Sequence, residues 1–307
     1  MKQPVQNEYD VAIIGGGPAG LSAALILGRS CKRVAVFDSG TPRNASAKAV
    51  HGFLTRDGIA PREMRRIARE EAAVYGTVDF FDARVSALHA NDGPRKFQID
   101  FETRSIVVKN VLLATGMVDH LPDIPGLPAL WDAGESVFLC PYCHGWENRD
   151  QSWALLAENP ADAEWALLLT GWTGNLMVFT NGKYELPAAV RNRLTDAGVK
   201  IENGAIQQLL STTDRPDQLA EIELVDGRRI PRTVLFVRSN QTQPELVRQL
   251  GVALSPTGQV IVDPRMQTSI PGIYAAGDLT TQGQQAIAAA AAGAMAGALI
   301  NQGLNTE

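Results

Sequence analysis

The sequence predicts an α/β protein of two Rossmann-like domains, each a three-layer ββα arrangement, with the second domain inserted into the first. Two observations predict this class. The chain opens with a strand-like run, a glycine-rich turn and a helical run, and a second α/β stretch over residues 153–237 separates this opening from another strand that ends in glycine and aspartate. We expect the outer domain over residues 1–117 and 240–307, and the inserted domain over residues 118–239.

Composition excludes several classes of function. With 28 Lys and Arg against 33 Asp and Glu, the net charge of −5 argues against a sequence-independent grip on nucleic acid. The N-terminus has no apolar signal region, and the apolar run over residues 286–300 is too short and too rich in alanine to span a bilayer. Three cysteines are too few for a secreted disulfide scaffold. We therefore expect a cytoplasmic protein without nucleic-acid or membrane partners.

The first elements follow from hydrophobic periodicity. Residues 10–14 and 33–37 are apolar runs that predict two strands, with a helix over residues 21–27 between them. Residues 61–75 predict a further helix, and their mixed charges indicate a solvated face that carries Arg62, Arg65, Arg66 and Arg69.

The next elements complete the outer domain. Alternating apolar residues in 97–101 and 106–108 predict a small antiparallel meander, which a buried strand over residues 110–116 closes. A strand-like run over residues 272–276 and an alanine-rich helix form the C-terminal part.

The glycine turn between the first strand and helix has the pattern of a dinucleotide site. Gly15 permits the tight turn, Gly17 lets the backbone approach a pyrophosphate, and Gly20 allows close packing of helix and strand. Asp38 ends the second strand 18 residues after Gly20, near the spacing of an acid that binds ribose hydroxyls. A glycine turn alone could be structural, but the strand, the helix and Asp38 together predict dinucleotide binding.

A second glycine signal stands near the C-terminus. Gly277-Asp278 follows a predicted buried strand and precedes Gln285-Ala286, which begin the alanine-rich helix. The N–H groups of that helix can stabilise a ring that gains negative charge, such as a reduced flavin. The alanines also allow close packing of the helix, and the two interpretations are compatible.

The chemical centre of the sequence is Cys140-Pro-Tyr-Cys143-His144. Two thiols in CxxC spacing can close a disulfide and pass two electrons by thiolate exchange, and a position at a helix N-terminus favours the thiolate. His144 can deliver or remove a proton. A structural pair or a zinc site are the alternatives, but no second CxxC or spaced histidine pair supports metal binding, so we expect none. We expect Cys31 to be a small buried residue.

Together these residues resemble the low-molecular-weight thioredoxin reductase family, whose FAD domain is interrupted by a pyridine-nucleotide domain. The resemblance covers nearly the whole chain and rests on Gly15 to Gly20, Ala114-Thr-Gly116, the cysteine pair and Gly277-Asp278. It implies that Cys143 lies against the flavin and Cys140 exchanges with substrate, with His144 in place of the family's usual acid. The FAD contacts that it implies are Gly15, Gly17, Pro18, Ala19, Asp38, Arg43, His51, Val85, Ala114, Thr115, Gly116, Gly277, Asp278, Gln285 and Ala286.

The chain departs from that family where NADPH should bind. Residues 152–169 contain no glycine, Glu158 stands where a pyrophosphate should approach the backbone, and Asn159-Pro160 removes one N–H donor. A single lysine, Lys183, remains of the basic cluster for a 2′-phosphate. We therefore expect that NADPH does not bind. All five tryptophans fall in or beside this domain, and they either form core or stack on a second cofactor.

The resemblance is therefore nearest to the diflavin-linked disulfide oxidoreductases and to fungal-type dithiol oxidases, in which a histidine after the CxxC is thought to act as acid and base. It implies an FAD-dependent thiol/disulfide oxidoreductase that is independent of NADPH, with a second FAD as an option. The expected partners are a dithiol or disulfide, thioredoxin or another small redox protein, and a second copy in a homodimer. A ferredoxin-linked thioredoxin reductase, an O2-dependent dithiol oxidase and a flavin redox sensor without turnover are the alternatives.

Overall fold

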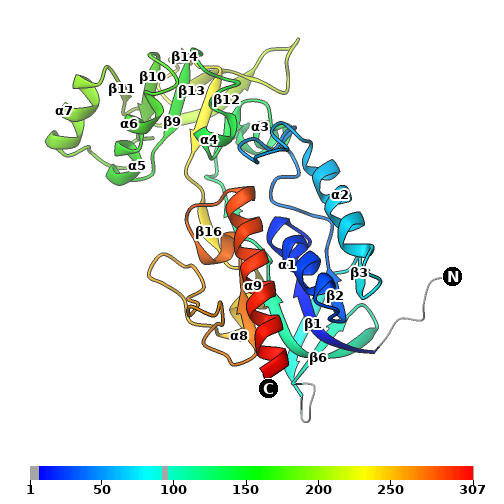
Figure 1. The fold of residues 1–307 in the computed structure, drawn as a ribbon. Coiled ribbons are helices and arrows are strands. Elements are labelled where there is room, and N and C mark those ends of the chain that lie inside the picture. The colour runs from blue at the N-terminus through cyan, green and yellow to red at the C-terminus, as the bar shows by residue number, and fades with distance from the viewer. Residues whose placement is uncertain (1–6, 92–95, 307) are drawn as a thin grey trace. The chain divides into compact units, whose positions relative to one another are not determined.

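The computed structural model describes residues 7–91 and 96–306. The chain divides into two compact units (Figure 1). Unit 1 comprises residues 1–45, 52–118 and 241–307, and unit 2 comprises residues 46–51 and 119–240. Residues 46–51, which the sequence assigned to the outer domain, belong to unit 2. Each unit has the predicted α/β class.

Unit 1 is built on one mixed sheet. Strands β3, β2, β1 and β6 run in this order and are parallel, β17 pairs with β6, and β6 continues into the antiparallel strands β5 and β4. The predicted meander is therefore present. The strands are β1 (Glu8–Ile14), β2 (Val34–Phe37), β3 (Val78–Phe81), β4 (Val85–Ala90), β5 (Phe97–Phe101), β6 (Arg104–Leu113) and β17 (Ile273–Ala275).

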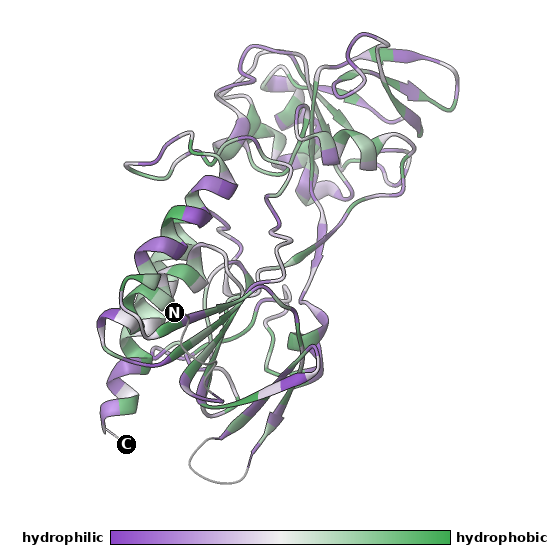
Figure 2. Cartoon of the chain, turned by 90° about the vertical axis from the view of Figure 1, so that its right-hand side faces the viewer, coloured by the Kyte–Doolittle hydropathy of each residue, from purple (hydrophilic) through white to green (hydrophobic). Residues whose placement is uncertain are grey.

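Alternation along β1 divides the core of unit 1 into two layers. Val11 and Ile13 pack towards the helices, whereas Ala12 and Ile14 pack towards the meander. The helices are α1 (Pro18–Arg29), α2 (Pro61–Ala73), α8 (Glu245–Leu250) and α9 (Ala286–Thr306), with a short turn η1 (Asp278–Thr280). Figure 2 shows the strands of this sheet mainly in green, the hydrophobic colour. This is the three-layer ββα arrangement.

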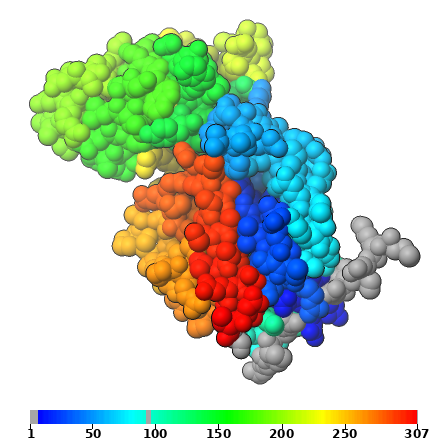
Figure 3. All heavy atoms as spheres, viewed as in Figure 1, coloured from blue at the N-terminus to red at the C-terminus, as the bar shows by residue number. Residues whose placement is uncertain are grey.

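Helix α9 lies along α1 (Figures 1 and 3) because small residues bring the two backbones together. A Cβ at Gly293 would come within 1.9 Å of the Ala19 carbonyl oxygen, and one at Gly297 within 3.0 Å of that of Ala23. By length and composition alone α9 could also cross a membrane, unlike the shorter run considered in the sequence. Its glycines, however, form a helix–helix contact inside unit 1.

Unit 2 repeats the architecture. A parallel sheet has the order β11-β10-β9-β15-β8, and β12, β13 and β14 form a separate antiparallel sheet. The strands are β8 (Val137–Phe138), β9 (Trp153–Leu156), β10 (Leu176–Phe179), β11 (Lys200–Glu202), β12 (Ile206–Ser211), β13 (Leu219–Leu224), β14 (Arg229–Pro231) and β15 (Val234–Val237). The helices are α3 (Leu127–Ala133), α4 (Pro141–His144), α5 (Pro160–Glu164), α6 (Ala166–Leu169) and α7 (Ala188–Asp196). Where the chain passes between the units, β7 (Val118–His120) pairs with β16 (Asn240–Thr242).

Four of the five tryptophans belong to the core of unit 2. Trp153 is fully buried in β9, and Trp165 and Trp172 pack on the same cluster. Trp131 packs on the cluster at the other face of the sheet. Only Trp146 is strongly exposed, at 66%. Of the two interpretations of the tryptophans, core packing therefore accounts for all but one.

Candidate functional site

The glycine turn of unit 1 forms an open cradle at the start of α1. Gly15 has a φ of +120°, and a Cβ there would come within 2.1 Å of the Ala114 carbonyl oxygen. A Cβ at Gly20 would meet the Gly15 carbonyl oxygen at 1.9 Å, whereas a Cβ at Gly17 would meet nothing within 4 Å in the described part of the chain. Among the described residues no side chain caps α1 at Gly17, where Pro18 begins the helix. The cradle therefore leaves room and N–H groups for a phosphate.

Asp38 lies against this turn, as its spacing predicted. A Cβ at Gly16 would come within 2.4 Å of Asp38 Oδ2, so the carboxylate packs directly on the glycines. Its other oxygen accepts a hydrogen bond from the Gly40 N–H at 2.9 Å. The acid thus stands beside the cradle, at the end of β2.

Arg65 is a neighbour that the sequence did not reveal. Its Nη2 lies 2.5 Å from Asp38 Oδ2, and its side chain is only 19% exposed. The expectation that Arg65 belongs to a solvated helix face is therefore wrong. Arg65 stands between the buried Pro61 and Ala72 at helical spacing, on the inner side of α2, and this position was a usable signal. Arg66, in contrast, pairs with Glu63 and Glu70 on the exposed side.

Three more predicted FAD contacts border the cradle. Ala114, Thr115 and Gly116 follow β6, the strand next to β1. The Thr115 hydroxyl is buried and has no hydrogen-bond partner among the described residues. Gly116 has a φ of +66° with open space where a Cβ would stand. A buried unpaired hydroxyl beside an open glycine fits a polar ligand group, as FAD would supply.

The Gly277-Asp278 segment closes the cradle from the side of β17. Gly277 has a φ of +90°, and a Cβ there would come within 2.9 Å of the Ala19 side chain, next to the start of α1. Arg43 Nη1 lies 3.3 Å from Asp278 Oδ2 and also donates to Gln284, which exchanges hydrogen bonds with Gln241. Gln285 and Ala286 stand at the start of α9, whereas Val85 is buried at the start of β4. The residues of unit 1 therefore fit an FAD site.

The predicted redox pair, Cys140 and Cys143, lies in unit 2. Cys140 precedes α4 in extended conformation, and Cys143 and His144 end this four-residue helix. The Cys143 N–H donates to the Cys140 carbonyl oxygen at 3.2 Å, so one turn brings the cysteines together. Both cysteines are partly exposed. The carbonyl oxygen of His144 accepts a hydrogen bond from the Asn148 side chain, which anchors the end of the turn.

His144 is held as a neutral imidazole. Its ring stacks on Phe138, with centroids 4.3 Å apart and planes at 12°, and its Nδ1 is buried without a partner in the described part of the chain. Burial lowers the pKa of His144 below its ordinary value near 6.5, against the opposing effects of a hydrogen bond with the Cys140 backbone and the charge of Glu147. A neutral imidazole has a free nitrogen lone pair and can therefore accept a proton.

His51, a predicted FAD contact, belongs to unit 2 together with the redox pair. Its Nε2 lies 3.4 Å from Glu147 Oε1, and both groups act electrostatically on His144. The structure thus gathers His51, His144 and Glu147 around the CxxC segment. Glu147 was not among the predicted site residues, although it stands only four positions after Cys143. The role of His51 at the flavin stays a prediction.

The lowered pKa of His144 predicts a pH-dependent stability of unit 2. Between the lowered pKa of the folded state and about pH 6.5, the unfolded chain binds a proton at this position and the folded chain does not, so the free energy of unfolding should fall as the pH falls through this range. His144→Gln should weaken this dependence. Urea unfolding at pH 7.5 and 5.5 measures it, and tryptophan fluorescence reports on unit 2 because all five tryptophans lie there. An equal loss of stability in parent and variant would show that His144 does not take up the proton.

The segment after β9 differs from a phosphate-binding turn in its hydrogen bonds as well as in its sequence. Asn159 Oδ1 accepts the Asp162 N–H at 3.0 Å and so caps α5. Asp162 Oδ2 accepts from the Glu158 N–H at 3.3 Å and from Asn159 Nδ2 at 2.8 Å. Side chains of this segment therefore occupy backbone donors that a pyrophosphate would need.

The carboxylates of Glu158 and Asp162 make the segment after β9 acidic. Glu158 pairs with Lys183, and Arg238 Nε lies 3.6 Å from Asp162 Oδ1. Burial raises the pKa of Asp162. Burial and the charges of Asp162 and Glu158 raise the pKa of the Tyr184 phenol to about 12. Lys183, the one lysine in residues 179–183, is thus engaged by Glu158.

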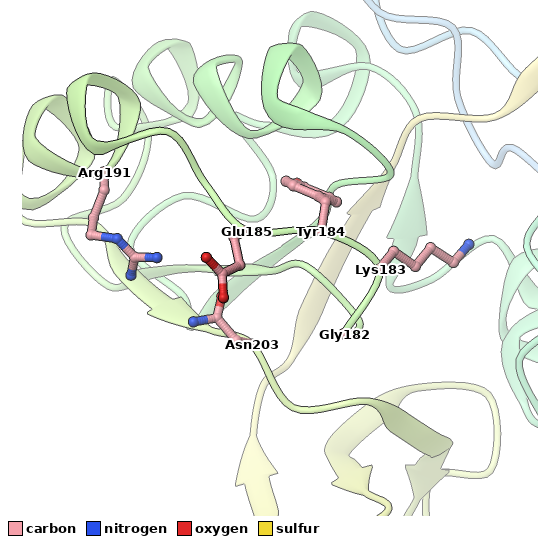
Figure 4. A pocket seen from close by; sticks show the side chains of 6 residues that line it. All are labelled: Gly182, Lys183, Tyr184, Glu185, Arg191 and Asn203. Atoms are coloured by element: carbon pink, nitrogen blue, oxygen red, sulfur yellow. The ribbon is translucent and has the colours of Figure 1, made fainter.

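An open pocket of about 400 Å³ lies beyond β10, where a 2′-phosphate would be expected. Figure 4 shows the side chains of Arg191, Glu185 and Asn203 directed into it, while Lys183 points away. One arginine therefore shares the pocket with a carboxylate. This mixture of charges differs from the all-basic surroundings that a phosphate prefers.

Cys31 is not buried, contrary to the expectation from its sequence context. It follows α1 with a φ of +57°, in the left-handed region, and its residue is exposed. The helix ends at Arg29, so Cys31 turns outward instead of packing on the inner face of α1. Among the described residues no three His, Cys, Asp or Glu side chains gather as a metal site.

Comparison with known proteins identifies the family. Residues 9–153 and 175–293 match the family model described as pyridine nucleotide-disulphide oxidoreductase. The chain is 30% identical to thioredoxin reductase sirT of Leptosphaeria maculans over 95% of this chain and 93% of that protein. It is 33% identical to thioredoxin reductase aclD of Aspergillus oryzae over 88% of each.

Solved structures agree with this match. The crystal structure of putative thioredoxin reductase TrxB from Bacillus anthracis superimposes with a TM-score of 0.90 at 34% identity, over 97% of this chain and 99% of that one. This confirms the predicted fold class of two Rossmann-like domains. The chain belongs to the pyridine nucleotide-disulphide oxidoreductase family, as a flavin-dependent enzyme with thioredoxin reductase-like relatives.

Proposed function

We propose that this protein is an FAD-dependent thiol/disulfide oxidoreductase that works through Cys140 and Cys143 and does not use NADPH. Two observations together carry the proposal. The glycine cradle of unit 1 fits FAD, whereas in unit 2 the side chains of Asn159 and Asp162 occupy backbone donors of the segment after β9. The family model also leaves residues 154–174, which include this segment, unmatched.

The chemistry at the cysteine pair is a thiol–disulfide exchange. A thiolate of the substrate attacks Cys140 Sγ of the oxidised pair, the bond between the two sulfurs breaks, and Cys143 leaves as a thiolate. The second substrate thiolate then displaces Cys140, so that the substrate becomes a disulfide and the pair holds two electrons. We assign the role of proton acceptor to His144, which follows Cys143 directly in the chain and whose pKa is lowered by burial. Bound FAD supplies the two-electron acceptor that reoxidises the pair.

In unit 1 the chain's own groups hold the cofactor. The cradle at Gly17 and the start of α1 would hold the pyrophosphate, and Asp38 would hold a ribose. Arg43 holds Asp278, and the N–H groups at the start of α9 would stabilise negative charge on a reduced flavin ring. The proposed substrate is a dithiol, with thioredoxin or another small redox protein as the alternative, and the proposed assembly is a homodimer in the cytoplasm.

An absorbance experiment tests the proposal. Flavin released from the purified protein is counted per chain, and NADPH and then dithiothreitol are added without oxygen. We expect bleaching by dithiothreitol and none by NADPH. Rapid bleaching by NADPH would mean that the altered segment still binds nucleotide and that the protein is an ordinary thioredoxin reductase.

The same experiment separates the other candidates. Two flavins per chain would place the protein with the diflavin-linked enzymes, in which the second flavin accompanies a lost nucleotide site. Reoxidation of the bleached protein by O2 with release of H2O2 supports a dithiol oxidase, whereas reduction by ferredoxin supports a thioredoxin reductase. A single bleaching without repeated turnover would indicate a redox sensor.

A further inference from the structure

Residues 140–147 of unit 2, which contain the two cysteines and are called the redox segment below, carry two large aromatic side chains on their surface. Tyr142 stands between the two cysteines and is 58% exposed, and Trp146 follows three residues after Cys143 and is 66% exposed. Most large aromatic side chains of this unit are buried or pack on its core clusters. Exposed rings within three residues of the reactive cysteines in the chain indicate a surface that a substrate covers.

The Tyr142 ring packs against an aromatic side chain of unit 2. The Tyr142 ring meets the edge of Trp172 with centroids 5.5 Å apart at 85°, and Trp172 stacks in turn on the buried Trp153 at 6.5 Å. Gly145 makes this possible, because a Cβ there would come within 2.8 Å of Trp172 Nε1. The Tyr142 ring is thus fixed before a substrate arrives, which lowers the entropic cost of stacking on it.

Trp146 is fixed by Arg149. The guanidinium carbon lies 4.1 Å from the centre of the Trp146 ring, and Arg149 Nη1 donates to the Trp146 carbonyl oxygen at 2.7 Å. The cation covers one face of the indole and holds it by a cation–π contact. At 66% exposure, the rest of the ring remains open to a second flat group.

We propose that Tyr142 and Trp146 form an aromatic rim that selects dithiols carrying a flat aromatic group. The inference rests on the proposed function, since the cysteine pair defines the occupant as a dithiol. Two preformed rings next to Cys140 and Cys143 bind an aromatic frame by stacking and place its sulfurs beside the pair. A small polar dithiol makes no such contact.

Two dithiols that oxidise to six-membered cyclic disulfides test the rim. 1,2-Bis(mercaptomethyl)benzene carries an aromatic ring, and dithiothreitol does not. With the flavin-loaded full chain, Trp146→Ala and Tyr142→Ala should each raise KM for the aromatic dithiol about tenfold and change kcat little. KM for dithiothreitol should stay within about twofold. Val225→Ala, which removes an exposed apolar side chain elsewhere in unit 2, is the control.

The outcomes separate this inference from the proposed function. Failure of dithiothreitol to bleach the parent protein would overturn the proposed function, and the rim with it. Bleaching by dithiothreitol with an unchanged KM for the aromatic dithiol in both variants would overturn the rim alone. Equal changes for the two dithiols would show a structural effect on the redox segment and would also overturn the rim. If KM for both dithiols is unchanged in the variants but they reduce thioredoxin more slowly, the surface binds a protein partner. This result would overturn the proposal of an aromatic dithiol.

Discussion

Cys143→Ser is expected to lower the turnover of dithiols at least about a thousandfold while FAD remains bound. With serine at position 143, Cys140 has no partner with which to form the oxidised pair, so the substrate thiolate has no S–S bond to attack. The flavin cradle lies in unit 1 and contains neither cysteine, so binding of FAD should not change. The measurement is steady-state oxidation of dithiothreitol, together with the visible spectrum.

Cys31→Ser provides a matched control. Cys31 is exposed and lies in unit 1, whereas the CxxC pair lies in unit 2. Its replacement should therefore leave turnover unchanged. Cys140→Ser should be as inactive as Cys143→Ser, since Cys140 is the sulfur that the substrate attacks. Turnover at the parent rate in either CxxC variant would refute the mechanism through this pair.

Gly15→Ala and Gly17→Ala should differ strongly although the two glycines are two positions apart. Gly15 has a φ of +120°, and a Cβ would overlap the Ala114 carbonyl oxygen at 2.1 Å, so alanine separates β1 from the end of β6. We expect a loss of about 3 kcal/mol or more in the stability of unit 1. Calorimetry measures this, since the tryptophans all report on unit 2.

Gly17→Ala should leave the protein without cofactor nearly as stable as the parent. Its backbone is extended, with a φ of −84°, and a Cβ meets nothing within 4 Å in the described part of the chain. The methyl group instead fills space that the pyrophosphate needs, so FAD affinity should fall about tenfold to a hundredfold in a titration followed by flavin fluorescence. Equal affinity in parent and Gly17→Ala would place the pyrophosphate elsewhere.

Local patterns predicted most of the fold. Alternation along residues 97–108 and the turn at Gly15 to Gly20 specify the meander and the first βα unit, because both signals depend on residues that are close in the chain. The same holds for Asp38, whose distance from the turn is set by one helix and one strand. The prediction for Cys31 was wrong because helical periodicity does not show where α1 ends.

The sequence by itself determined that one chain contains a flavoprotein-type glycine turn and a CxxC pair. It also determined that residues 152–169, where NADPH should bind, contain no glycine. Only the tertiary structure decided that Arg65 neutralises Asp38 and that His51 joins Glu147. These partners lie 27 and 96 positions apart, so packing and not periodicity brings them together. Likewise, the sequence gives the number of tryptophans but not their surroundings. Only the structure shows that Trp153 is buried in the core and that Trp146, three residues after Cys143, is exposed to solvent.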